Sequence, residues 1–182
     1  MMNGTMVPGD TPVSLNEARG WLRMGATVDD AVIAGLIRAA TNVCEAFIGR
    51  WLIVRAAEEE VVLRAGVARL GIRPVVGVDA VTLLTATGGE TALDASDYRL
   101  SVGEDGTARL APAAAGIAGR LRVRYRAGLA AESNAIPEAI RQGIVRLVQH
   151  LHEARDGAGA APPAAVAALW QPWRRVGLGG AA

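Results

Sequence analysis

The sequence lacks lysine altogether, because all 19 of its basic residues are arginines, and 18 acidic residues leave a net charge of only +1. A charge so close to zero gives no strong overall field toward nucleic acid or a membrane surface. The single cysteine, Cys44, excludes an internal disulfide framework. Residues 1–12 have neither the basic stretch nor the apolar run of a signal peptide, and no apolar run approaches the roughly 18 residues that span a bilayer. We therefore expect a protein that is made and kept in a cytoplasm, or packed into a particle there, with no membrane partner.

Residues that carry chemistry are equally scarce. The two histidines, His150 and His152, are two positions apart, so a helix places them on different faces and they cannot share a metal ion. No serine lies in a nucleophile elbow. The glycine-rich run at 177–180 has no helix after it, so it cannot form a phosphate loop. The sequence thus predicts no catalytic residue, no cofactor and no metal, and it gives an enzyme function no support.

What is present is a globular composition, with 51% hydrophobic and 20% charged residues over 182 positions, which suits one domain with tails. Residues 1–13 read as a flexible arm. Ser14 and Glu17 form a capping box that begins a helix over 14–24. A longer helix follows over 28–49, and Cys44 falls on its apolar stripe, so we expect this thiol to be buried. A third long helix over 137–156 begins at Pro137, whose missing N–H costs nothing at that position.

Between residues 51 and 126 the pattern changes to short β-branched runs broken by glycine, which predicts strands. The candidate strands are Leu52–Ala56, Glu60–Leu63, Val78–Leu84 and Tyr98–Val102. Glycine-containing turns are expected at 87–90 and 104–107. The acidic run Glu58–Glu60 is interpreted as a solvated strand edge, and residues 111–119 as a mobile loop. The fold class is therefore α+β: a helical hairpin and a long C-terminal helix packed with a small antiparallel β-sheet, followed by an extended C-terminal tail.

The last strand candidate alternates strictly between arginine and apolar residues. Its apolar members are Leu121, Val123 and Tyr125, which should face the core. Its other face should carry four arginines in a row, Arg120, Arg122, Arg124 and Arg126. Like charges on adjacent positions of a strand face repel. Either this face is a solvated edge that resists aggregation, or it faces acidic groups of a neighbouring subunit or the phosphates of DNA.

Residues 158–182 read as a linker and a docking tail. The run GAGAAPP separates the tail from the third helix, and an aromatic and basic cluster follows: Trp170, Trp173, Arg174, Arg175 and Val176. The cluster either folds back on the core or inserts into a partner, since Trp and Arg are enriched at interface hot spots. The residues of the tail leave both interpretations open.

Two blocks of the sequence resemble the head–tail connector (adaptor) proteins of tailed phages and phage-like gene transfer agents. The first block covers the helical hairpin and the residues after it, and the second covers the arginine strand and the third helix in the runs VRYRAGL, IPEAI and IVRLVQHLHEAR. The chain departs from the family pattern at Leu129 and His152, where an aromatic residue and a tyrosine are common. The residues that carry the first block are Leu15, Glu17, Ala18, Leu22, Asp30, Ile33, Leu36, Ile37, Ala39, Ala40, Glu45, Ala46, Ile48, Gly49, Arg50, Leu52 and Ile53.

This resemblance implies a structural virion protein, with residues 14–157 as the connector domain. It implies a homo-oligomeric ring of about a dozen copies at the head–tail junction, assembled in a bacterial host cytoplasm. The implied partners are the portal protein and the next neck or tail (stopper) protein, with DNA only as cargo passing through the channel. The resemblance also favours the second interpretation of the tail, which is then mobile in the free protein and becomes ordered on docking to the portal. The alternative is a small nucleic-acid-binding module that uses the arginine strand and the Trp/Arg tail, although the net charge argues against it. A small enzyme of unnamed class is a further alternative without any motif to support it.

Overall fold

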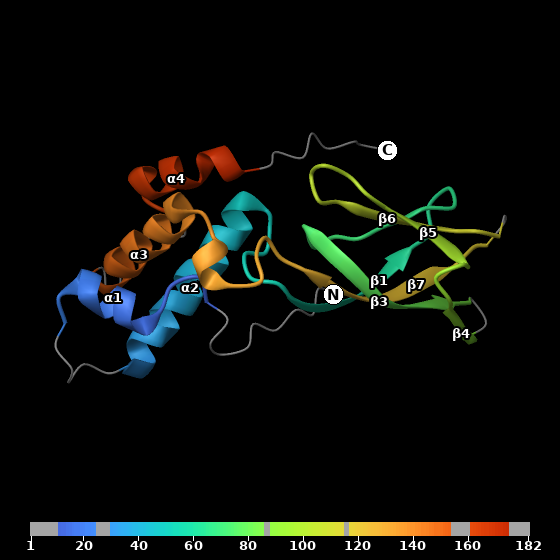
Figure 1. Cartoon of the computed structure of the whole chain (residues 1–182), viewed down its shortest axis with the longest axis horizontal. Coiled ribbons are helices and arrows are strands. Elements are labelled where there is room, and N and C mark those ends of the chain that lie inside the picture. Colours follow the sequence, from blue (N-terminus) through green and yellow to red (C-terminus); the bar gives the residue numbers. More distant parts are fainter. Residues whose placement is uncertain (1–10, 25–29, 86–87, 115–116, 154–160, 175–182) are drawn as a thin grey trace. The chain divides into compact units, whose positions relative to one another are not determined.

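The computed structural model describes residues 11–24, 30–85, 88–114, 117–153 and 161–174, and it divides the chain into two compact units. The helical unit contains residues 8–49 and 132–182, and the strand unit contains residues 50–131 together with 1–7. The helices and strands of these units are drawn in Figure 1. The α+β class predicted from the sequence is confirmed, with every strand pair antiparallel.

Within the described residues, the helical unit is built from four α-helices, and the first three agree closely with the helices predicted over 14–24, 28–49 and 137–156. Ser14 and Glu17 form the expected capping box, in which the Glu17 N–H donates to Ser14 Oγ at 3.2 Å and the Ser14 N–H donates to Glu17 Oε2 at 3.1 Å. Gly49 follows the second helix with a φ of 70°, which favours glycine and ends the helix. The elements are α1 (Leu15–Leu22), α2 (Asp30–Ile48), the 3-10 turn η1 (Ser133–Ala135), α3 (Glu138–Glu153), α4 (Ala164–Trp170) and the 3-10 turn η2 (Gln171–Trp173).

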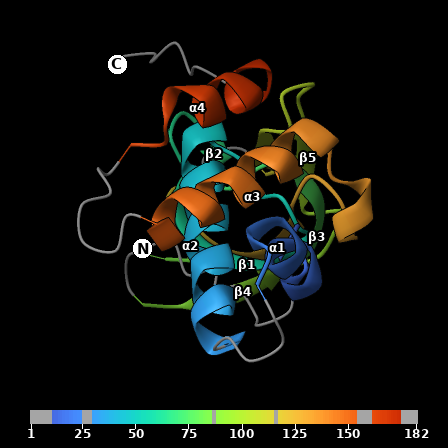
Figure 2. The same cartoon turned by 90° about the vertical axis from the view of Figure 1, so that its left-hand side faces the viewer.

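The core of the helical unit lies between α2 and α3, which lie side by side in both views (Figures 1 and 2). Cys44 is fully buried on the α2 stripe, as predicted, and burial raises the pKa of its thiol far above the ordinary value. Each buried Ile or Leu of such a stripe contributes about 1.5–3 kcal/mol relative to an exposed position. The fully or nearly buried members of the two stripes are Ile33, Ile37, Ala40, Cys44 and Ile48 on α2, and Ile140, Ile144, Leu147 and Val148 on α3.

Helix α2 is also long and apolar enough to cross a membrane by length and composition alone, with a mean hydropathy of 1.5 over an 18-residue window of its 19 residues. The sequence analysis found no such run. In the structure, however, the stripe that makes α2 apolar is the one that packs into the core of the helical unit. We therefore assign α2 as a core helix.

Among its described residues, the strand unit contains two antiparallel sheets rather than the single sheet expected. The larger sheet has the order β1-β7-β3-β4 and the smaller has the order β2-β6-β5. Strand β5 has the predicted bounds, β1 merges two candidates into one strand, and β2, β4 and β6 were not predicted. The strands are β1 (Arg55–Val62), β2 (Ala68–Arg69), β3 (Val75–Leu84), β4 (Glu90–Leu93), β5 (Tyr98–Val102), β6 (Ala108–Pro112) and β7 (Arg120–Ala127).

The inner faces of the two sheets contribute to one hydrophobic cluster, to which β7 supplies Leu121, Val123 and Tyr125, all fully buried as predicted. Glu59 corrects the interpretation of Glu58–Glu60 as a solvated edge, because it is only 7% exposed. Its carboxylate accepts a hydrogen bond from the Gly71 N–H at 2.9 Å and interacts with the Tyr125 hydroxyl. Burial and this carboxylate raise the pKa of Tyr125. Alternation places Glu59 on the inner face, and a hydrogen-bonded carboxylate is the form in which such a group is tolerated there.

Candidate interaction surfaces

The four arginines of β7 share one face, as predicted, but β7 is a central strand and not an edge. It pairs with β1 on one side and with β3 on the other. This register places glutamates of β1 opposite two of the arginines, with Glu58 opposite Arg124 and Glu60 opposite Arg122. The interpretation as a solvated edge strand is therefore wrong, and the row lies between acidic neighbours.

Most of the arginine row is paired within the chain. Arg122 contacts both Glu60 and Glu90 at 3.0 Å, and these hydrogen bonds raise the pKa of its guanidinium. Arg120 contacts Glu60 at 3.3 Å, and Arg126 contacts Asp79 at 3.2 Å. Such pairs are solvent-exposed and contribute little to stability, typically under about 1 kcal/mol each. Their main consequence is that this face carries mixed charge rather than a positive field.

Arg124 is the exception in the row. It is exposed, and within the described part of the chain it forms no ion pair, although Glu58 is its cross-strand partner in the register. Arg124 and Glu58 are thus an exposed cation and anion near the middle of the face. Both are available to charges on another molecule.

The tail contains the largest difference from the sequence expectation. Helix α4 lies along α3 in both views (Figures 1 and 2), and Trp170 at its end is fully buried. The Trp170 indole N–H donates to the Ile140 carbonyl at 3.2 Å, and its ring centroid lies 5.8 Å from that of Phe47. Gly143 provides the space, since a Cβ at that position would lie 2.1 Å from Trp170 Nε1. Trp170 therefore belongs to the core of the helical unit and is not a mobile docking residue.

The remainder of the predicted docking cluster is closer to the surface. Trp173 is half-buried at the end of η2, and Arg174 is exposed with its guanidinium carbon 5.1 Å from the Phe47 ring centroid. Arg175 and Val176 lie outside the described residues. The structure thus separates Trp170, which the fold uses, from the positions that follow it.

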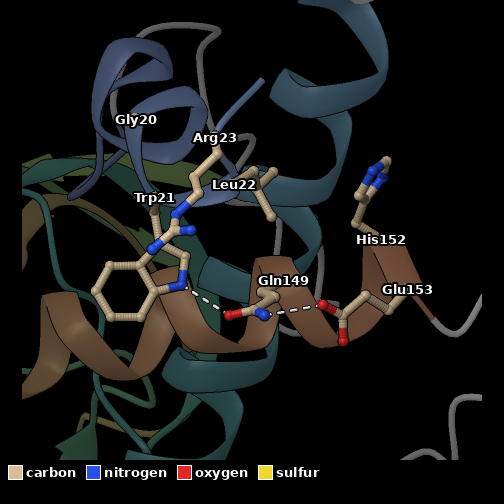
Figure 3. Close-up of a pocket in the computed structure, with 7 residues that line it drawn as sticks. All are labelled: Gly20, Trp21, Leu22, Arg23, Gln149, His152 and Glu153. Atoms are coloured by element: carbon tan, nitrogen blue, oxygen red, sulfur yellow. Dashed lines mark hydrogen bonds between the residues drawn. The ribbon is translucent and has the colours of Figure 1, made fainter. Parts of the chain in front are cut away.

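An exposed tryptophan on α1 was not predicted from the sequence. Trp21 is one helical turn after the buried Ala18, yet it is 41% exposed and lines a pocket of about 540 Å³ (Figure 3). Its indole N–H donates to Gln149 Oε1 at 2.8 Å, and the Gln149 amide donates to Glu153 Oε1 at 2.8 Å. The pocket also includes His152 and Arg23. It holds no nucleophile–base pair, and the described residues contain no group of three or more His, Cys, Asp or Glu side chains placed to hold a metal.

The chain is similar to known proteins over most or all of its length. The head completion protein family matches residues 12–157. Solved structures of gene transfer agent particles contain chains with the same fold. A chain in the neck of an empty particle, computed with C6 symmetry, has a TM-score of 0.80 and 29% identity, and the match covers 100% of this chain and 98% of that one. A chain in the virion of the native particle has a TM-score of 0.79 and 29% identity with the same coverage.

A third match is to a chain in the neck of the native particle, computed with C12 symmetry, with a TM-score of 0.77 and 27% identity over 100% of this chain and 98% of that chain. No curated protein sequence matches the chain. The likenesses extend over the whole chain, so they include both the helical unit and the strand unit.

Proposed function

We propose that this chain, a structural head–tail connector that belongs to the head completion protein family, docks to the portal protein on one side of its ring and to the next neck or tail protein on the other. Its place is the head–tail junction of the virion, where it forms an oligomeric ring. The observation that carries the proposal is the full-length likeness to neck chains of gene transfer agent particles. By analogy with the C12 symmetry of one such neck, we propose a ring of about a dozen copies that has no enzymatic activity and that DNA crosses only as cargo.

The portal-docking segment in this proposal begins at Trp173. Trp170 is excluded because its indole is already buried against α3. Trp173 and Arg174 are the described residues of the cluster that remain accessible, and Arg175 and Val176 continue the segment. Tryptophan and arginine are the residue types most enriched at interface hot spots. In a ring the contribution of each tail is multiplied, because binding of one tail raises the effective concentration of the others.

The outer face of β7 is proposed as a contact between copies in the ring. Ring contacts are heterologous, so each copy needs two different complementary surfaces. Arg120 and Arg126 are 60% and 57% exposed in their side chains, so they can exchange carboxylates of their own chain for those of a neighbour. Arg124 forms no ion pair among the described residues, so it can pair with a carboxylate of a neighbouring copy without first losing one of its own chain. The same in-chain pairing argues against the nucleic-acid-binding alternative, because carboxylates already neutralise three of the four arginines.

The docking role is tested by mixing purified portal rings with the wild-type chain and with a variant that combines Trp173→Ala and Arg174→Ala. Native mass measurement reports both ring formation and portal binding. The variant should form its own ring but bind the portal at least about tenfold more weakly, as expected for loss of hot-spot contacts. The matched control is Gln171→Ala, an exposed change on the same 3-10 turn, which should bind normally. Undiminished portal binding by the double variant would refute the docking role.

The ring contact is tested separately by Arg124→Glu. Because Arg124 is exposed and forms no ion pair among the described residues, its reversal should change thermal stability by less than about 1 kcal/mol and lower the yield of rings. The control is Arg64→Glu, at the turn between β1 and β2. Normal ring yield from Arg124→Glu would remove this face from the interface.

A further inference from the structure

A second arginine cluster lies on the smaller sheet, and it has no partner within the described chain. Arg69 on β2 and Arg109 on β6 are directly opposite each other in the register, and Ser101 on β5 is opposite Arg109. Arg99 is two positions before Ser101, so the three arginines share one face, which we call the basic face. All three arginines are exposed.

The basic face differs from the β7 row in its charge balance. Carboxylates of β1, β3 and β4 surround the β7 row, whereas the strand positions that neighbour Arg99 and Arg109 on their own face are Ser101, Ala111 and Arg69. Within the described residues, Arg69, Arg99 and Arg109 take part in no ion pair. Like charges directly opposite on paired strands are destabilising. The fold therefore tolerates an unfavourable arrangement that an anionic partner would relieve.

The same sheet also ends in an open edge. Strand β5 is the last strand in the order β2-β6-β5, and no described strand pairs with its outer side. The Gly103 N–H donates to the Thr107 carbonyl at 2.9 Å, and the Ala113 N–H donates to the Asp97 carbonyl at 2.8 Å. Because hydrogen-bonded and non-bonded pairs alternate in an antiparallel ladder, the backbone groups of Tyr98, Leu100 and Val102 point away from β6. These groups are available to an added strand.

The side chains at this edge are apolar and incompletely covered. Leu100 and Val102 are opposite the buried Leu110 and Ala108, so they lie on the inner face of the sheet. They nevertheless remain 37% and 49% exposed, because no described strand lies beyond them. An exposed, apolar edge strand is the template on which extended segments add to a sheet.

We propose that the smaller sheet binds an extended acidic segment of another protein, which adds as a strand beside β5. In this arrangement carboxylates of the segment lie beside Arg99 and near Arg109, and its apolar side chains cover Leu100 and Val102. The partner segment therefore alternates carboxylate and apolar residues. A pocket of about 240 Å³ lined by Tyr98, Arg99 and residues 111–113 receives a side chain at the start of β5. This inference depends on the proposed connector function in one respect only, which is that the partner is expected to be another protein of the same particle.

The test uses the full chain and a synthetic peptide of alternating glutamate and valine, followed by backbone amide NMR shifts. Titration should shift the amides of β5, and the effect should weaken with salt because charge pairs contribute to it. A peptide of alternating lysine and valine should not bind. Combining Arg99→Glu with Arg109→Glu should weaken binding at least about tenfold, as for lost charge-assisted contacts, whereas Arg120→Glu on the larger sheet should bind normally.

Two further variants separate binding from folding. Val102→Pro removes an N–H that the fold does not use, so it should abolish the β5 shifts, while Val102→Thr keeps this N–H and should retain them. Arg109→Glu alone places an anion opposite Arg69, so it should raise the thermal midpoint while it weakens peptide binding. This opposite sign would not follow from a variant that simply unfolds.

Four outcomes would overturn the proposal. Peptide shifts outside β5, or equal binding by the doubly reversed variant, would show that the basic face is not used. Binding of a DNA duplex with a steep salt dependence, without peptide binding, would make it a phosphate-binding face. Protection of the β5 amides on concentrating the chain alone would make the occupant a second copy. None of these results bears on portal binding by the tail, so failure here is distinguishable from failure of the connector role.

Discussion

Trp170→Ala is the change that most directly tests how the C-terminal residues are used. The side chain is fully buried, packs beside Phe47 and donates a hydrogen bond to the Ile140 carbonyl. Replacement of a buried Trp by Ala costs about 3–5 kcal/mol, because the transfer energy is lost and a cavity remains. The Ile140 carbonyl loses this indole partner, which adds about 1 kcal/mol. We therefore expect Trp170→Ala to remove a large part of the stability of the helical unit, since whole domains have only about 5–15 kcal/mol.

Urea unfolding followed by the helical circular dichroism signal measures this loss. With a slope of about 2 kcal/mol per molar urea, a loss of about 4 kcal/mol lowers the midpoint by about 2 M. The matched control is Trp173→Ala, a half-buried tryptophan three positions later, which should cost about 1 kcal/mol or less. Truncation after Gly159 should destabilise the chain at least as much as Trp170→Ala, because it removes all of α4. Equal midpoints for the two tryptophan variants would show that α4 is undocked in solution, and that the tail is free as the sequence alone indicated.

Three other predictions address single contacts. Gly143→Ala should cost about 1–3 kcal/mol in a urea titration despite the better helix propensity of alanine, because the new Cβ would overlap the Trp170 indole; a neutral result would place the indole elsewhere. Cys44 should react with a thiol reagent only on unfolding, since burial excludes the reagent and raises the pKa of the thiol; rapid labelling in native buffer would contradict this. The Thr107 hydroxyl donates a hydrogen bond to Asp105 and is the main reason why the pKa of Asp105 is lowered. The stability that this bond contributes is therefore present above a pH of about 4 and is lost as the pH falls through the pKa of Asp105 in the folded protein. Thr107→Val should raise the pKa of Asp105 in an NMR titration, and an unchanged pKa would exclude the hydroxyl as the cause of the shift.

The elements that the sequence predicted well are those whose signals are local. The capping box at Ser14 and Glu17, the end of the second helix near residue 49 and the long helix after Pro137 each depend on a few adjacent residues, and each is present. The alternation in β7 likewise predicted which side chains face the core. Strands β2, β4 and β6 were missed because they contain almost no β-branched or aromatic residues, so they become strands only through pairing with other strands. Division of the strands between two sheets is also set by long-range pairing.

The two groups of arginines on the sheets also could not be interpreted from local sequence, because their neighbours come from distant strands. Arg120–Arg126 is conspicuous in the sequence because its arginines are consecutive on one face, yet its neutralising partners come from β1, β3 and β4. Arg69, Arg99 and Arg109 are inconspicuous because three separate strands bring them together. Whether a carboxylate neutralises the charge of an arginine depends on the register of the paired strands, and the order of residues along the chain does not give that register. A charged run was therefore a poor guide to where unbalanced charge lies.

The tail illustrates why composition alone misplaced a core residue. The Ala, Gly and Pro residues before α4 indicate a linker, and a tryptophan after a linker reads as a docking residue. The sequence feature that argues against a docking role is Gly143, which contacts Trp170 and lies in the middle of α3, where the neighbouring residues favour a helix. A glycine inside a helix costs about 1 kcal/mol relative to alanine, so its presence indicates that something approaches the helix closely. In this chain that neighbour is the Trp170 indole. A helix-interior glycine and a tryptophan beyond a short linker, taken together, would have predicted that the chain folds back and that docking begins only after Trp170.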